Sequence, residues 1–251
     1  MLGLSKADDS DSIGAYQRGD NMRLAPVVAT ALVFAMSGSA FAQEYVLYAS
    51  KDDRFTILFP TPPKVTVTTF KSQYGYDLPA RIYEADAAGA AKGHYKVTVA
   101  DYSGIRSMGE ERAKHCPVGA EPCIGNPAPA GSTGAGYWKA DTWGATIYAT
   151  SLFLLKKPDL KYLGWATMDA VEGTLLNVVN ADKSQTAAAI YMHENKLYIV
   201  DGTVPAGMPP PDWFNQNLGW LDENGLQVRY QSIYHNGYPK PEATHRPVAQ
   251  Q

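Results

Sequence analysis

Alternating polar and apolar positions predict most of the secondary structure of this chain. Residues 54–60 alternate between polar and apolar side chains, which predicts a strand. The strand is expected to end at Pro60, Pro62 and Pro63, because proline has no N–H to donate to a ladder. The same alternation, with many β-branched residues, predicts three further strands in the first half of the chain, at 64–70, 78–86 and 93–102. Short polar or glycine-containing turns join them, which favours an antiparallel meander.

The pattern changes after residue 104. Residues 105–114 are compatible with a helix, and residues 115–136 are rich in proline and glycine, so a long loop is expected there. Residues 137–157 carry apolar residues at helical spacing, and Pro158 ends the segment. Part of this segment also alternates, so helix is favoured and strand is the alternative.

Strands return in the second half of the chain. Residues 193–195 form a tight turn between two of them, and Asp212 is expected to cap a helix over 213–221 that turns Trp213 and Trp220 into the core. The strands predicted here are 162–169, 173–179, 186–192, 196–202 and 226–230. Strand runs interrupted by segregated helices indicate an α+β fold, with a central antiparallel sheet flanked by helices in an α/β/α sandwich.

An uncharged apolar run near the start of the chain predicts a cleavable export signal. The run 24–36 follows the positive Met22-Arg23 and precedes Ala40-Phe41-Ala42, which matches the small-x-small site of signal peptidase. Its thirteen residues span roughly 20 Å as a helix, short of the ~30 Å hydrocarbon core. Cleavage between Ala42 and Gln43 is expected, with a membrane anchor or a buried core helix as alternatives.

These features divide the chain into four parts. Residues 1–21 are polar and acidic, unlike a signal sequence, so we interpret them as an extension from a start assigned too early. The signal peptide covers 22–42, a single α+β domain covers 43–232, and a flexible tail covers 233–251. The processed protein is expected to be periplasmic or secreted and to have no integral membrane span.

Charge and cysteine content limit the possible partners. The chain has 22 Lys and Arg against 25 Asp and Glu, with no basic run, so nucleic acid is not an expected partner. Cys116 and Cys123, the two cysteines, are expected to form a disulfide in an oxidising compartment. A redox pair is the alternative, although the spacing is not Cys-x-x-Cys, and so is a metal site with His115, although adjacent residues chelate one ion poorly.

No catalytic motif stands out. Ser103 lacks the glycines of a nucleophile elbow, and the glycine-rich stretch 131–136 lacks the Lys-Ser/Thr of a phosphate loop. The five histidines have no metal-ligand spacing, and we interpret them as structural or solvated, with no metal and no cofactor expected. The aromatic residues are the one open lead, because Trp138, Trp143 and Trp165 are candidates to line a pocket for a sugar or an apolar ligand, with ordinary core packing as the alternative.

Three stretches resemble a known family. Residues 54–63 are similar to the F-S-V-x-F-P-x-x-P opening of exported bacterial proteins with the PsbP-like and Mog-type fold. Residues 196–205 resemble the R-L-Y strand of these proteins, and residues 213–218 resemble the helix that follows it, with Asn217 where Ser is usual. The resemblance covers roughly 54–230 and implies a helix–sheet–helix sandwich that serves as a binding or assembly module. It implies no catalytic residues, and the insertion at 115–136 departs from the family pattern.

The expected function is therefore that of an exported, non-enzymatic module that binds a protein or envelope partner. Two alternatives stay open. One is an exported hydrolase whose residues meet only in the folded chain, and the other is a small-ligand binding protein that uses the aromatic residues.

Overall fold

The computed structural model describes residues 45–89, 92–115 and 136–248. The expected signal peptide, its cleavage site at Ala42 and Gln43, and the expected disulfide between Cys116 and Cys123 lie outside the described residues.

A seven-stranded antiparallel sheet forms the centre of the domain. Its strands, from one edge to the other, are β3 (Lys64–Lys71), β4 (Asp77–Ala87), β5 (Gly93–Asp101), β9 (Lys196–Val204), β8 (Gln185–His193), β7 (Val171–Val179) and β6 (Asp159–Met168). Each of these strands was predicted from the alternation. The predicted turn between β8 and β9 is confirmed, and both of its central residues, Glu194 (φ 47°) and Asn195 (φ 58°), have the positive φ of a type I′ hairpin turn.

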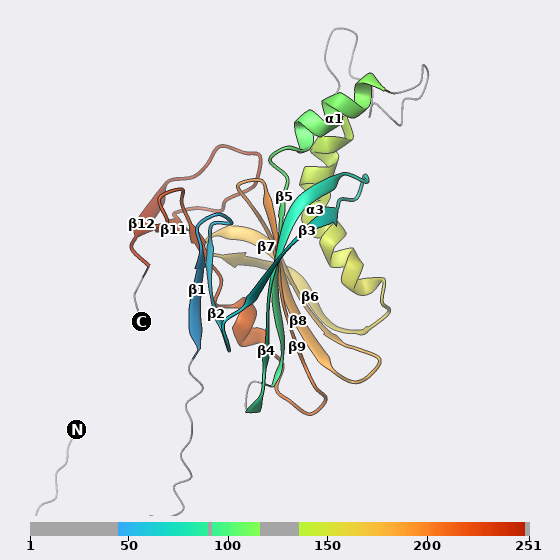
Figure 1. Cartoon of the computed structure of the whole chain (residues 1–251), viewed down its shortest axis with the longest axis vertical. Coiled ribbons are helices and arrows are strands. Elements are labelled where there is room, and N and C mark those ends of the chain that lie inside the picture. The colour runs from blue at the N-terminus through green and yellow to red at the C-terminus, as the bar shows by residue number, and fades with distance from the viewer. Residues whose placement is uncertain (1–44, 90–91, 116–135, 249–251) are drawn as a thin grey trace, which may run out of the picture. The chain divides into compact units, whose positions relative to one another are not determined.

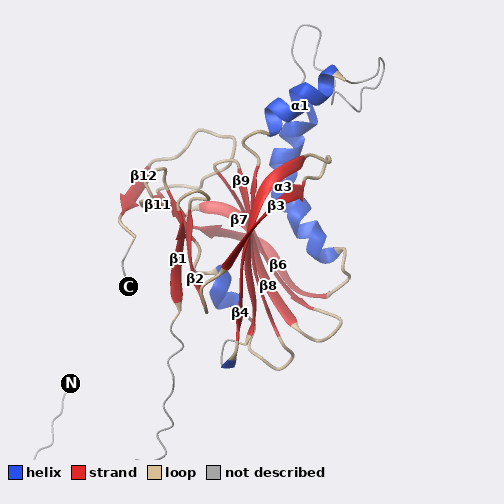
Figure 2. Cartoon of the chain, in the orientation of Figure 1, coloured by secondary structure: helices blue, strands red, loops and turns tan. Residues whose placement is uncertain are grey.

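A smaller five-stranded sheet lies against one face of the first (Figures 1 and 2). It contains the predicted strands β2 and β11 and three strands that the alternation did not reveal. The order is β1 (Val46–Ser50), β2 (Phe55–Phe59), β10 (Gly219–Leu221), β11 (Gln227–Tyr230) and β12 (Ala243–Arg246). Phe55 and Trp220 face each other across β2 and β10 and are fully buried between the two sheets. This packing explains why residues at both ends of the domain join one sheet.

Two helices cover the other face of the seven-stranded sheet. These are α1 (Ile105–Lys114) and α3 (Gly136–Leu154), so the helical interpretation of 137–157 is confirmed. Figure 1 shows them on the side opposite the small sheet. The α+β class is thus established, but helix layers on both faces are not confirmed, because the five-stranded sheet occupies the face where the second layer was expected.

The predicted helix over 213–221 is wrong. Only one turn forms, α4 (Asp212–Asn215), and the chain then enters strand β10. Trp220 is held in the strand because its indole Nε1 donates to the Met168 carbonyl at 2.7 Å. Asp212 does not cap the turn: Pro211 is the N-cap residue, and the Asp212 carboxylate instead accepts from Asn177 Nδ2 at 2.9 Å.

The segment 233–251, expected to be a flexible tail, is anchored as far as Arg246. Strand β12 pairs with β11, and Tyr234 forms a bridge with Val171 on β7. The Tyr234 ring is buried and stacks on Tyr230, with ring centroids 4.9 Å apart. One buried tyrosine and one short strand thus fix a segment whose composition looked mobile. Within the described ranges, no helix has the length and apolar character needed to cross a membrane.

Candidate aromatic pocket

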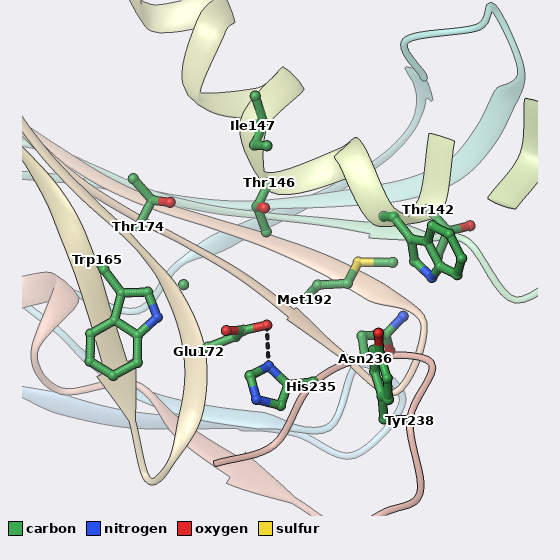
Figure 3. Close-up of a pocket in the computed structure, with 12 residues that line it drawn as sticks. Thr142, Thr146, Ile147, Trp165, Glu172, Thr174, Met192, His235, Asn236 and Tyr238 are labelled. Carbon is green, nitrogen blue, oxygen red and sulfur yellow. Dashed lines mark ion pairs between the residues drawn. The ribbon is translucent and has the colours of Figure 1, made fainter. Parts of the chain in front are cut away.

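A pocket of about 340 Å³ opens where helix α3, strands β6 to β8 and residues 235–238 meet (Figure 3). We call it the aromatic pocket. Its lining comes from three places: Thr142, Trp143, Thr146 and Ile147 on α3; Trp165, Glu172, Gly173, Thr174 and Met192 on the sheet; and His235, Asn236 and Tyr238 in the segment between β11 and β12.

The helix supplies one wall of the aromatic pocket. Thr142 and Thr146, like Trp143 and Ile147, are four residues apart and so share one face of α3. The Trp143 side chain is 65% exposed, and its indole Nε1 lies against Gly237, where an added Cβ would sit 3.3 Å away. Gly237 has φ +87°, so this close approach and this backbone conformation both suit glycine.

The sheet supplies the floor. Trp165 on β6 lies directly opposite Thr174 on β7, and Thr167 lies opposite Glu172. Directly opposed residues of an antiparallel pair point to the same face, which here is the face that carries α3. Since β6 is an edge strand of the seven-stranded sheet, Trp165 remains 64% exposed.

The third wall is fixed by polar contacts. His235 Nδ1 lies 2.6 Å from Glu172 Oε1, and both side chains are partly exposed to the aromatic pocket (Figure 3). The next residue, Asn236, is held by the β8–β9 turn: its Oδ1 accepts from the Asn195 N–H at 2.9 Å, and its Nδ2 donates to Asn195 Oδ1 at 3.1 Å. The wall is therefore built by long-range contacts.

The structure brings together two of the three predicted tryptophans. Trp143 and Trp165 both line the aromatic pocket, whereas Trp138 does not. Trp138 instead packs against the core between the sheet and the helices, with the Arg106 guanidinium 5.9 Å from its ring. Sequence reasoning missed Glu172, His235 and Tyr238, because it placed the last two in a flexible tail.

The aromatic pocket offers surfaces for binding. Its carboxyl and imidazole side chains are Glu172 and His235, which pair with each other through Glu172 Oε1 and His235 Nδ1. Among the described residues, none of the three lining threonines is hydrogen-bonded to either of them, so the nucleophile arrangement that would support a hydrolase is not seen there. Nor do the described residues contain a group of three or more His, Cys, Asp or Glu that could hold a metal ion.

Comparison with known proteins adds little. No protein-family model and no curated protein matches the chain. Among solved structures, the chain is similar to cyanobacterial PsbP (CyanoP) from Synechocystis sp. PCC 6803, with 10% sequence identity and a TM-score of 0.33 over 67% of this chain and 84% of that one. This solved structure comes from the group that the strand motifs resemble, but a TM-score this low carries no argument about function.

Proposed function

We propose that this protein is a binding module that acts after export, and that the aromatic pocket is its ligand site. The observation that carries the proposal is the meeting of two exposed tryptophans, Trp143 and Trp165, from separate elements at one pocket with an ion pair beside them. The export signal and the Cys116–Cys123 disulfide belong to the same proposal.

The exposed indoles favour a ligand with apolar faces. A buried Trp removes roughly 150–250 Å² from water, so two tryptophans that stay about two-thirds exposed forgo much of that stabilisation in the free protein. A ligand that covers both rings recovers it. Pockets of a few hundred Å³ with aromatic walls and a few convergent polar groups are typical of small-ligand sites.

The polar groups favour a saccharide. A sugar ring has C–H faces that stack on an indole and hydroxyls that need both donors and acceptors. The carboxylate of Glu172, the ring of His235 and the hydroxyls of Thr146 and Thr174 supply both kinds of group.

An NMR titration tests this proposal. The ¹⁵N-labelled domain from Gln43 is titrated separately with N,N′-diacetylchitobiose and with cellobiose, which differ in the acetamido group. We expect at least one of them to shift amide signals on α3, on β6–β7 and in residues 235–238 together. Shifts elsewhere only, or none with either saccharide, would contradict the proposal.

A protein partner is the second candidate. Exposed apolar side chains extend beyond the aromatic pocket to Leu163 on β6, and contiguous exposed apolar surface often marks an interaction site. Leu163 shares the α3 face of the sheet but does not line the pocket. Capture of one stoichiometric protein from envelope extract by tagged domain, lost in Leu163→Ser, would favour this candidate over the saccharide.

A further inference from the structure

A second cavity, of about 690 Å³, lies on the same face of the seven-stranded sheet, beneath the C-terminal half of α3. We call it the α3 cavity. Leu152 and Phe153 on the helix, with Phe70 on β3, provide apolar walls. None of these residues lines the aromatic pocket, so the α3 cavity is a separate feature of the molecule.

The floor of the α3 cavity is polar, which is unusual for a sheet face covered by a helix. Lys96 on β5 and Asp201 on β9 are directly opposed across the sheet. Next to them, Thr186 and Thr203 are also opposed, and their hydroxyl oxygens are 2.8 Å apart. Together with His94 and Thr98 on the same face of β5, these four side chains make a polar floor, whereas Ile199 on the same face of β9 is apolar.

Asp201 is the unexplained member of this group. Its side chain is 7% exposed, and Oδ2 accepts no hydrogen bond within the described part of the chain. The ammonium of Lys96 lies 3.3 Å away, at ion-pair distance but without hydrogen-bond geometry. Burial raises the pKa of Asp201, and the positive charge of Lys96 opposes that rise. A buried carboxylate oxygen without a well-aligned donor is destabilising, and such atoms are rare without a functional or structural reason.

The charges around Asp201 select the polar head of a ligand. Lys96 and Lys156 both lie close enough to act on this carboxylate electrostatically, so a further cation is disfavoured there. An anionic head would place a second negative charge beside an enclosed carboxylate. A neutral group with a donor next to an acceptor satisfies both Asp201 and Lys96, and a primary amide has that arrangement.

We propose that the α3 cavity is a second ligand site, for a small molecule with an apolar body and a neutral amide head. The head donates an N–H to the Asp201 carboxylate and accepts from the Lys96 ammonium, while the body lies against Leu152 and Phe153. This proposal is independent of the saccharide proposal, because the two sites share no residue.

The test uses three probes that differ only in the head group: 4-phenylbutanamide, 4-phenylbutanoate and 4-phenylbutylamine. Binding to the ¹⁵N-labelled domain is followed by NMR. We expect the amide to bind at least about tenfold more tightly than the acid and the amine, a difference of ~1.4 kcal/mol. Its shifts should map to β5, β9 and the second half of α3.

Two variants locate the binding. Asp201→Leu removes the acceptor at similar volume, and Leu152→Trp fills the cavity from the helix, so the second variant decides if the first does not fold. Each should weaken amide binding at least about tenfold, whereas the same change at an exposed site, Asp77→Leu on β4, should not. Unchanged affinity in a folded Asp201→Leu or Leu152→Trp protein, or an acid or amine that binds as tightly as the amide, would overturn the proposal.

Discussion

His235 and Glu172 are joined by an ion pair in which Nδ1 and Oε1 lie 2.6 Å apart. The contact ties the segment after β11 to strand β7, and it does so at the floor of the aromatic pocket. A residue near the end of the domain thus completes a site whose other walls are an edge strand and a helix.

The first prediction concerns this pair. Glu172→Gln removes the negative charge and one strong acceptor, so saccharide affinity should fall about tenfold. Stability should change little, by at most about 1 kcal/mol, because both partners are partly exposed and exposed ion pairs contribute little. Calorimetric titration and thermal unfolding separate the two effects. A fall in melting temperature with unchanged affinity would show that the pair has only a structural role.

A second prediction concerns the buried carboxylate of Asp53. It accepts hydrogen bonds from Tyr83 (2.6 Å), Arg81 (2.7 Å) and Lys196 (3.1 Å), and so links the β1–β2 turn to the large sheet. Asp53→Ala leaves the nearly buried Lys196 poorly paired and should cost about 3–5 kcal/mol of unfolding free energy.

The exposed pair Lys71–Asp77 provides the matched control for Asp53. Both of its side chains are about two-thirds exposed, so Asp77→Ala should cost at most ~1 kcal/mol. Urea unfolding of the two variants measures the difference directly. Equal costs would mean that the Asp53 network does not hold the two sheets together.

The third prediction concerns pH. His193 is fully buried, with Nε2 2.8 Å from the Tyr230 hydroxyl, and burial lowers its pKa to about 4 from 6.5, although Glu194 opposes the shift. Between these values the unfolded chain binds the proton and the folded chain does not. The contribution of neutral His193 to the free energy of unfolding is therefore fully present above pH 6.5. It is lost as the pH falls towards 4, by about 3 kcal/mol in all.

His193→Phe tests this assignment. The variant loses the bond to Tyr230 and should be less stable at neutral pH by about 1–3 kcal/mol. It should also lose less stability than the native protein between about pH 7.5 and about pH 4.5, as measured by urea unfolding. An equal loss in both proteins would assign the acid sensitivity to other groups.

The fourth prediction concerns processing. When the whole chain is expressed in a bacterial host, the periplasmic product should begin at Gln43, as read by N-terminal sequencing. Replacing Ala40 and Ala42 by Leu should block cleavage, because signal peptidase needs small residues there. Ser39→Leu, just outside the recognised pair, is the control and should be cleaved. A periplasmic product that still carries residues before Gln43 would contradict the cleavage prediction.

The strands were predictable where one face of the strand is apolar and the other is polar, as at 54–60 and 93–102. The region 213–221 was not, because Trp213 and Trp220 suit a helix by spacing, while Trp220 is held in a strand by contacts with Phe55 and Met168. The site was predictable only in part for the same reason. Trp143 and Trp165 are visible in the sequence, but His235 joins them only because Tyr234 is buried against β7.

The most direct test of the central claim is a calorimetric titration of Trp143→Ala, Trp165→Ala and Tyr162→Ala with the saccharide that binds the native domain. Tyr162 is an exposed aromatic residue on β6 that faces away from the aromatic pocket, opposite Asn177, so it serves as the control. Each tryptophan variant should lose about tenfold or more in affinity, with little change in stability, and the tyrosine variant should bind as the native domain does. Native affinity in both tryptophan variants would contradict the account.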